Sequence, residues 1–492
     1  MKLGRWALPF LLFGLPSRAA LAQGADPAAN YTVDAAQGPV TGSTRVIGLG
    51  GAFVAIAESM DGVAVNPASV AVRLPYSWTR WDHAIGVHFA IGSWLPKTNF
   101  LNQSDRDQTA PSEDPSQPQG AEIEQRSLLF GSIGAVLYYQ QAGIGFSAEG
   151  QQQALSRSAD ASAGLAPTDL TGNFGIVHAS IGYGFGGGQL VLGAGPRVTG
   201  VGLSRATSAS GLLSVAGVGY QAGMVYKPQG QRFRLGAAYK SEVNPSLGSS
   251  GTSAEQGAYN ATALRLPWQA SAGVAVQLGP RPFNPPLVTV DDRTRAFRQQ
   301  LERDAEARER EVDEASAEYD RDPTPQNDER LARAKARQRR DEALDEHRLE
   351  RREEQADREL FAEYLARPRF FLLLTTELLV LGPSTDSVGL GSFYQGRSRV
   401  RLSGENLTVS PRIGLETELV PNWVKLRGGS YLEPARLVGS TDRVHGTGGF
   451  DLKLFRWNVF GLLGDFDSWT FSAAVDSARE YLSTSFSVGL WH

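Results

Sequence analysis

The sequence predicts an all-β fold, a transmembrane antiparallel β-barrel of about 14 strands with an N-terminal plug and an inserted long α-helical hairpin. Three observations lead to this fold class. Apolar residues alternate with small or polar ones in segments of about ten residues from residue 127 to the C-terminus. A short hydrophobic segment with a cleavage pattern stands at the N-terminus. One charged segment without glycine interrupts the alternating pattern, and it has the composition of a helix.

Composition limits the classes of function that need to be considered. The chain has 492 residues, a net charge of -4 and no cysteine. The balanced charge gives no reason to expect a nucleic-acid partner. The lack of cysteine excludes disulfides, thiolate nucleophiles and cysteine-ligated metals. The six histidines are scattered, so the sequence predicts no metal site and no cofactor. The 55 glycines beside 3 methionines suit a large β-structure better than a helical core.

The N-terminus has the features of a signal peptide. Residues 1–5 are basic, residues 6–15 are apolar, and residues 20–22 form a small-x-small cleavage pattern. The sequence therefore predicts a signal peptide over residues 1–22 and a mature start at Gln23. A single membrane anchor is the alternative, but the apolar run is too short and contains prolines. We expect the protein to be exported.

Period-two alternation predicts the strands. In residues 217–226, one face carries Val218, Tyr220, Ala222, Met224 and Tyr226, and the other carries Gly217, Gly219, Gln221 and Gly223. The same alternation occurs in residues 175–185, 233–240, 268–278, 409–418 and 481–492. A soluble β-sandwich would alternate in the same way, so this pattern alone leaves both folds open.

Three features favour the membrane barrel over the sandwich. The segments approach the nine to eleven residues that a tilted strand needs to cross a bilayer. Aromatic residues lie near segment ends, as an interfacial girdle requires, namely Tyr138, Tyr139, Trp268 and Trp469. The polar faces carry Arg, Lys, Glu and Gln, which suit a wet or plugged lumen. We therefore assign residues 75–287 and 369–492 to the barrel, with residues 97–126 and 155–172 as long extracellular loops.

The charged segment predicts a helical hairpin. Residues 294–367 are dense in Arg, Glu, Asp, Gln and Ala, and they form the centre of an insertion over residues 288–368. Apolar residues recur at spacings of three, four and seven in the first half. Pro323 and Pro325 should end the first helix, and a second should begin near Glu329. A charged disordered linker is the alternative. Strand counting alone does not decide on which side of the membrane the hairpin lies.

The stretch over residues 42–71 combines clustered glycines with a later Asn-Pro-Ala triplet. A dinucleotide-binding loop is one interpretation, but the glycine spacing does not match and an exported protein lacks the cofactor. Glycine and alanine instead allow close approach of backbones. Asn66 can cap a short helix, and Pro67 suits the first helical position. These residues therefore suit a closely packed segment, in which Asn66, Pro67 and Ala68 fit a structural turn better than a direct ligand contact.

This stretch resembles the N-terminal segment of the FadL-type outer-membrane hydrocarbon and long-chain fatty-acid transporter superfamily. The matching residues are Gly48, Gly50, Gly51, Ala52, Phe53, Ala55, Ala57, Asn66, Pro67 and Ala68. The resemblance implies that residues 23–74 fold inside the barrel as a hatch. Residues 266–279 also resemble a strand of that family that descends to the periplasm, which would place the hairpin on the periplasmic side. The hairpin has no counterpart in the ordinary family pattern.

The resemblance implies passive uptake of hydrophobic small molecules, such as long-chain fatty acids or hydrocarbons, across the bacterial outer membrane. The residues expected to gate the hatch are Gly48, Gly50, Gly51, Phe53, Asn66, Pro67 and Ala68. The expected partners are a hydrophobic ligand, outer-membrane lipid and a periplasmic protein bound by the 294–367 hairpin. An interaction or secretion-assembly role through the hairpin is the alternative function. We find no G-x-S-x-G motif and assign no catalytic residues, so we do not expect an enzyme.

Overall fold

The computed structural model describes residues 31–73, 77–92, 99–100, 102, 123–159, 166–205, 211–245, 261, 263–395, 402–437, 440–455 and 468–490. The predicted signal peptide and the mature start at Gln23 lie outside the described residues. Most of the predicted 97–126 loop does so too.

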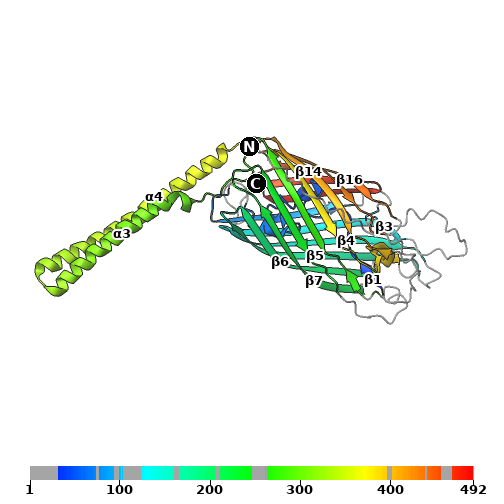
Figure 1. The fold of residues 1–492 in the computed structure, drawn as a ribbon, viewed down its shortest axis with the longest axis horizontal. Helices are drawn as coiled ribbons and strands as arrows, with labels where there is room; N and C mark the ends of the chain where they lie inside the picture. The colour runs from blue at the N-terminus through cyan, green and yellow to red at the C-terminus, as the bar shows by residue number, and fades with distance from the viewer. Residues whose placement is uncertain are drawn as a thin grey trace, which may run out of the picture.

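The described residues form a closed barrel of fourteen antiparallel strands (Figure 1). In chain order the strands are β2 Trp81–Ile91, β3 Ile123–Tyr139, β4 Ala142–Arg157, β5 Thr168–Phe185, β6 Leu190–Arg205, β7 Gly211–Tyr226, β8 Phe233–Lys240, β10 Gln269–Leu278, β11 Leu372–Leu381, β14 Thr408–Val420, β15 Val424–Glu433, β16 Arg443–Lys453, β17 Trp469–Ala478 and β18 Tyr481–Leu490. Each strand pairs with its neighbours in this order, and β18 closes the ring on β2. The predicted barrel is confirmed.

The outer wall of the barrel is apolar. Alternation turns one set of side chains outward, where Ile181 is 66% exposed and Val218 is 60% exposed. Exposed aromatic residues ring the barrel near the end where β2 begins, namely Trp81, Tyr139, Tyr183, Phe185, Tyr226 and Trp423. Tyr138 was predicted to belong to this aromatic girdle, and that prediction is wrong. Successive residues of a strand point to opposite faces, so Tyr139 faces outward and Tyr138 points into the lumen, where it is buried. A closed barrel with this outer surface belongs in the bacterial outer membrane.

The two ends of the barrel differ in their connections. At one end, two residues join β3 to β4, four join β5 to β6 and three join β14 to β15, although residues 454–468 are an exception. At the other end lie the longer connections over residues 92–122, 158–167, 241–268, 382–407 and 434–442, with residues 479–480 as a short exception. Residues 155–172 are not all loop, because β4 and β5 extend into that range.

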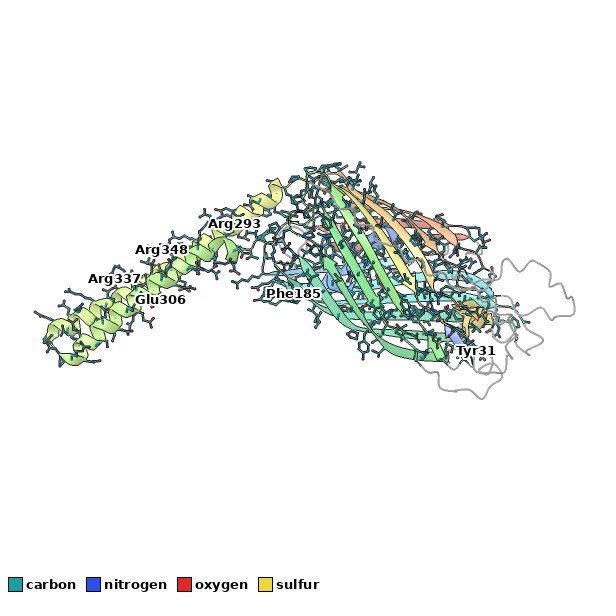
Figure 2. All side chains as sticks on the ribbon, viewed as in Figure 1. Tyr31, Phe185, Arg293, Glu306, Arg337 and Arg348 are labelled. Carbon is teal, nitrogen blue, oxygen red and sulfur yellow. The ribbon has the colours of Figure 1, made fainter. Side chains whose placement is uncertain are left out.

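A small sheet covers the end with the long connections. β1 Thr32–Asp34 pairs in parallel with β12 Ser387–Gly389 and β9 Ala263–Arg265, and β12 also pairs with β13 Leu402–Ser403. The helix α5 Leu390–Gln395 follows β12. A buried apolar cluster joins this sheet to the ends of the long strands, and it includes Val33, Leu155, Leu170, Leu203, Val388 and Phe393. The start of the described chain therefore lies at the end of the barrel away from the helical insertion, where Figure 2 labels Tyr31.

The inserted segment forms two antiparallel helices that project from the end with the short turns (Figure 1). α3 spans Val290–Arg321 and α4 spans Pro325–Ala366. Thr289 and Asp292 form a capping box at the start of α3. Pro325 does not end a helix as predicted, because it occupies the first position of α4 behind the cap residue Thr324. At 1.5 Å per residue, α3 and α4 are about 48 and 63 Å long.

Charged side chains cover the hairpin. Figure 2 shows them along both helices, with Arg293, Glu306, Arg337 and Arg348 labelled. Near the tip, the helices share a small apolar cluster of Ala315, Leu331, Ala334, Val312 and Tyr319. In the middle they are joined by an ion pair between Arg308 and the buried Asp345 at 2.6 Å. Among the described residues, no helix combines the length and apolar character needed to cross a bilayer.

Candidate functional site

The lumen contains the N-terminal segment, and we call residues 31–73 the hatch. Its first strand, β1, lies at the end of the barrel with the long connections, and its last residues lead to β2 at the opposite end. Between them lie α1 Thr44–Gly48, η1 Met60–Gly62 and η2 Pro67–Ala71. Almost every residue from 43 to 73 is buried. The hatch therefore runs through the lumen from one end to the other.

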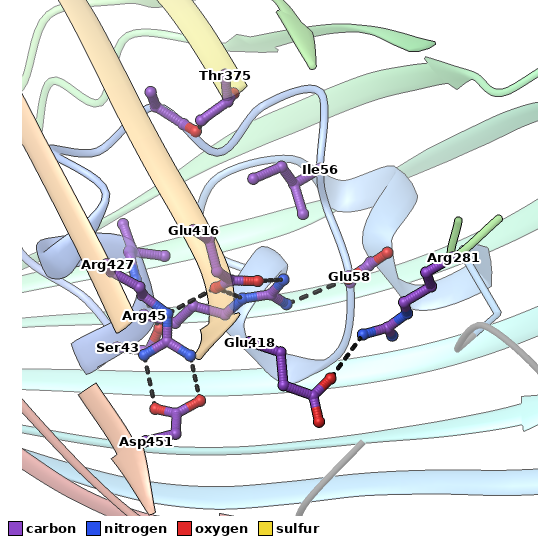
Figure 3. A network of polar contacts seen from close by, with 12 residues as sticks. Ser43, Arg45, Ile56, Glu58, Arg281, Thr375, Glu416, Glu418, Arg427 and Asp451 are labelled. Carbon is purple, nitrogen blue, oxygen red and sulfur yellow. Dashed lines mark hydrogen bonds and ion pairs between the residues drawn. The ribbon is translucent and has the colours of Figure 1, made fainter. Parts of the chain in front are cut away.

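A network of buried charges fastens the hatch to the wall (Figure 3). Arg45 of α1 donates from Nε and Nη2 to the carboxylate of Glu416 on β14, at 2.9 and 2.8 Å. It also donates from Nη1 to Glu58 of the hatch at 3.2 Å. Glu58 accepts a second bond, of 2.6 Å, from Arg234 on β8. Burial opposes ionisation of Glu58, but the guanidinium groups of Arg234 and Arg45 outweigh it and lower its pKa to about 2.

The wall continues this network across neighbouring strands. Arg427 of β15 donates from Nε to Glu416 at 2.6 Å and binds both carboxylate oxygens of Asp451 on β16. Opposite charges thus alternate from the hatch into three adjacent strands. Such a network stabilises one arrangement only, because removal of one buried partner leaves an unpaired charge at a cost of about 3–5 kcal/mol. The hatch position is therefore specified electrostatically.

Side chains of the wall also bind the backbone of the hatch. The Glu377 carboxylate accepts hydrogen bonds from the backbone nitrogens of Phe53, at 3.0 Å, and Val54, at 2.8 Å. On the same strand, the Thr375 hydroxyl donates to the carbonyl of Ala52 at 2.9 Å. Because these donors and acceptors lie in a non-helical part of the hatch, the wall satisfies backbone groups that would otherwise be buried without partners.

The predicted gating glycines Gly48, Gly50 and Gly51 lie against β14, β15 and β16. Gly50 and Gly51 adopt positive φ angles of 61° and 75°. A Cβ at Gly50 would lie 2.9 Å from the backbone nitrogen of Ser430, so a larger residue would not fit. The carbonyl of Gly48 accepts a hydrogen bond from the Thr447 hydroxyl at 3.1 Å. These glycines allow close approach of the hatch to the wall.

The Asn-Pro-Ala triplet lies farther along the hatch, against β6 and β7. The Oδ1 of Asn66 accepts from the Ala68 nitrogen at 3.0 Å and caps η2, which Pro67 begins. Its Nδ2 donates to the carbonyls of Val54, at 2.9 Å, and Met224, at 3.1 Å. Asn66 therefore links two parts of the hatch to the barrel wall, which is more than a local turn requires.

Glycines of the wall form the seat for the hatch, and the sequence analysis did not identify this role. A Cβ added to them would collide with the hatch at Gly143 (1.6 Å from Val70 O), Gly193 (2.3 Å from Pro67 O), Gly223 (2.0 Å from Asn66 Oδ1), Gly236 (2.2 Å from Val54 O) and Gly429 (2.5 Å from Leu49 C). The sequence offered one signal for this role, because Gly223 falls on the polar face of its strand, which turns toward the lumen. The wall partners Glu416 and Arg234 also fall on the polar faces of alternating segments, and Glu377 interrupts an apolar one, but the sequence did not match any of them to the hatch.

Two small polar cavities flank the hatch. One, of about 90 Å³, is lined by Arg45, Glu58, His88 and Lys425, among others. The other, of about 160 Å³, is lined by the cations Arg197, Lys240, Arg412 and Arg436 and by the acids Asp61, Glu149 and Glu377, among others. Both volumes fall below the roughly 300 Å³ at which ligand pockets usually begin. Neither cavity is large enough to hold a ligand of ordinary size.

A third hollow lies on the lipid-facing side of the wall. It has a volume of about 990 Å³ and is lined mainly by apolar side chains, including Leu137, Ile144, Phe146, Ile181 and Tyr220. The pairing of β5 and β6 is interrupted beneath it, since residues 179–180 and 195–196 are not paired. Pro196 has no N–H to donate to the ladder. A local break in pairing thus separates the 160 Å³ cavity from the lipid-facing hollow.

The buried histidine His445 occupies the wall near the long connections. Its Nδ1 lies 2.8 Å from Asp476 and its Nε2 lies 2.7 Å from Glu433. The Tyr431 hydroxyl donates to Asp476 at 2.7 Å and accepts from the Val40 nitrogen of the hatch at 3.1 Å. Because both ring nitrogens meet carboxylates, the imidazole of β16 bridges to β15 and β17.

Comparisons with known proteins give likenesses in architecture. No protein-family model matches the chain, and no curated protein sequence matches it. Among solved structures, a FadL homologue from Pseudomonas aeruginosa is 11% identical, with a TM-score of 0.47 over 94% of this chain and 99% of that one. The CymD monoaromatic hydrocarbon channel is 11% identical, with a TM-score of 0.44 over 92% and 97%. A mutant of the TodX monoaromatic hydrocarbon channel is also 11% identical, with a TM-score of 0.42 over 91% and 100%.

The chain resembles FadL-type channels. The fold itself rests on the closed strand pairing and not on these comparisons.

Proposed function

We propose that the protein is a hatch-gated channel for passive uptake of hydrophobic small molecules across the outer membrane. The observation that carries the proposal is the hatch itself, which lies inside a closed barrel and is held there by polar contacts with the wall. The resemblance of residues 42–71 to FadL-type transporters points to hydrophobic cargo. The residues proposed to gate are Gly48, Gly50, Gly51, Phe53, Asn66, Pro67 and Ala68.

The lining of the lumen favours amphiphilic cargo within this class. The 160 Å³ cavity presents four cationic side chains beside three acidic ones, and this excess of positive charge suits a carboxylate head group better than a neutral hydrocarbon. The break in pairing between β5 and β6 adjoins this cavity, and we expect a hydrophobic tail to leave the lumen there for the bilayer. A long-chain fatty acid fits both features.

The test is transport by purified protein in liposomes. Relative to empty liposomes, the parent protein should accelerate entry of a long-chain fatty acid more than entry of a neutral aromatic hydrocarbon or of a sugar of similar length. Lys240→Gln combined with Arg412→Gln removes two cavity cations. Because both side chains also donate to carbonyls of the hatch, the measured quantity is the rate of fatty-acid entry relative to that of the hydrocarbon, and this ratio should fall. Lys335→Gln combined with Arg339→Gln, on the exposed surface of α4, is the matched control. Equal entry of the fatty acid with the parent and with empty liposomes would overturn the proposal.

The hairpin favours a second role beside transport. It leaves the barrel at the end with the short turns, which in outer-membrane barrels faces the periplasm. Its length and charged surface would carry a binding face well away from the membrane. We therefore propose that the 294–367 hairpin binds a periplasmic protein.

A variant in which a short turn replaces residues 302–352 tests this role. It should leave uptake in liposomes unchanged, and in cells it should lose the site-specific crosslinks that the parent hairpin forms with a periplasmic protein. Persistence of those crosslinks would exclude the distal hairpin as the binding face.

A further inference from the structure

The base of the hairpin contacts residues 77–80, which directly precede β2. We call residues 290–301 of α3 and residues 353–366 of α4 the root. The Trp78 ring lies 5.3 Å from the Tyr364 ring and 6.0 Å from the Phe361 ring, measured between centroids. Its Nε1 donates to Asp357 at 2.9 Å. Trp78 is thus held by α4 through both apolar and polar contacts.

The neighbouring Arg80 is held by the other helix. Its guanidinium binds both carboxylate oxygens of Asp291 in the first turn of α3. Asp291 also pairs with Arg298 at 2.9 Å, and Arg298 reaches across to Glu353 of α4. One segment therefore contacts both helices of the root, so the contact depends on how the two helices are positioned together.

Arg73, the last described residue of the hatch before this segment, continues the connection into the lumen. Its guanidinium donates to the carbonyls of Thr79, at 2.7 Å, and Arg80, at 3.3 Å, and to the hydroxyl of Ser77. Arg73 is itself buried, and its guanidinium lies 5.7 Å from the centre of the Tyr138 ring in the lumen. Named contacts thus run from the root, through Trp78 and Arg80, to the end of the hatch.

The end of the hatch has little freedom to move independently. A Cβ at Gly143 would lie 1.6 Å from the carbonyl oxygen of Val70, and one at Gly182 would lie 3.1 Å from the Cβ of Ala71. Close packing of this kind transmits displacement instead of absorbing it. Farther out, α3 and α4 contact one another, for example through Arg308 and Asp345, so the distal hairpin forms a separate arm beyond the root.

We infer that the hairpin root is a brace that holds the hatch closed through Trp78 and Arg80. Release of the root lets the segment before β2 move, and η2 then leaves its glycine seat. A protein bound to the hairpin would act on the channel only if it altered these root contacts. The inference needs a closed hatch but does not depend on which molecule passes through the channel.

The chain offers a direct assay, because it has no cysteine. Ser69 is fully buried in η2, and its hydroxyl has no hydrogen-bond partner among the described residues. Ser69→Cys therefore supplies a single buried thiol whose rate of reaction with a water-soluble thiol reagent reports opening of the hatch. The rate is measured on the full-length protein, with heat-modifiable mobility on gels as the check that the barrel is folded.

The root variant combines Asp291→Ala, Asp357→Ala and Phe361→Ala, all of which lie outside the barrel and hatch. We expect the thiol to react at least tenfold faster in this variant. The matched control combines Arg308→Ala and Asp345→Ala, which break an ion pair of the distal hairpin, and should react within twofold of the parent. Equal rates in the root variant and the parent would overturn the brace. An equal acceleration in the control would also overturn it.

A variant in the segment that the root contacts completes the test. Trp78→Ala should accelerate the thiol reaction by itself, and addition of the root substitutions should add little, because both remove the same contact. Fully additive effects would show that the root acts on the hatch by another route. Uptake of fatty acid in liposomes is measured separately, so failure of the transport proposal leaves a clear result for the brace.

Discussion

The glycine seat of the hatch makes a quantitative prediction for Gly193→Ala. Gly193 lies on β6, and a Cβ there would be 2.3 Å from the Pro67 oxygen, 2.5 Å from the Pro67 carbonyl carbon and 2.6 Å from the Ala68 Cα. Ordinary contact begins at 3.4 Å, so the overlap with the oxygen is 3.4 − 2.3 = 1.1 Å. The hatch must move away from β6 by about this distance.

Overpacking of this kind costs about 1–3 kcal/mol. Because about 1.4 kcal/mol corresponds to a factor of ten, the open fraction of the hatch should rise roughly 5- to 150-fold. The strand itself should not suffer, since alanine is better than glycine in a strand interior by about 0.5–1 kcal/mol. The added methyl group should therefore loosen the hatch and leave the barrel as stable as before.

The assay is the reaction rate of the Ser69→Cys thiol, together with uptake of a long-chain fatty acid in liposomes. Gly200→Ala is the matched control, because it lies on the same strand and its Cβ would meet only the Val215 oxygen at 3.9 Å. Gly193→Ala should react faster and transport more, whereas Gly200→Ala should match the parent. The reasoning is refuted if both variants react at the same rate, or if Gly193→Ala lowers the thermal stability of the barrel instead.

Three other predictions test the hatch and the hairpin. Asn66→Ala removes the cap of η2 and two donated hydrogen bonds, so it should destabilise the hatch by about 2–4 kcal/mol and accelerate the thiol reaction. A stable barrel with an unchanged thiol rate would contradict this role of Asn66. Glu58 has its pKa lowered from 4.5 to about 2, so its contribution to hatch stability is complete above about pH 4.5 and is lost as the pH falls toward 2. The thiol reaction, measured with a reagent whose own rate is corrected for pH, should accelerate over that range in the parent and stay flat in Glu58→Gln. Deletion of residues 294–367 should leave barrel insertion intact, because the hairpin lies outside the strand ladder, and loss of heat-modifiable mobility would show otherwise.

The local patterns of the sequence were sufficient for the barrel. Period-two alternation requires only that one face of each strand meets lipid and the other meets the lumen. It can therefore be recognised in each segment without knowing which strands pair with it. The prediction for residues 217–226 was confirmed in this way, with Val218 and Tyr220 exposed and Gln221 buried. Tyr138 shows the limit of the argument, because an aromatic residue near a strand end faces lipid or lumen according to register alone.

The contacts of the hatch required the tertiary structure. Arg45 meets Glu416 across 371 positions in the sequence, and Asn66 meets Met224 across 158. Nothing local distinguishes Glu416 from the other charges that alternate along β14. Which inward side chain meets the hatch depends on strand register and on the depth to which the hatch enters, and both are set by the whole assembly of strands.

The sequence by itself determined the alternating strands, a small-residue segment before them and a charged helical insertion, because propensity and periodicity act over a few residues. Tertiary structure alone decided that wall glycines form the seat of the hatch, that buried ion pairs hold it, and that Trp78 and Arg80 meet the root of the hairpin. These contacts form only when closure of the barrel brings distant strands and both ends of the insertion to fixed positions.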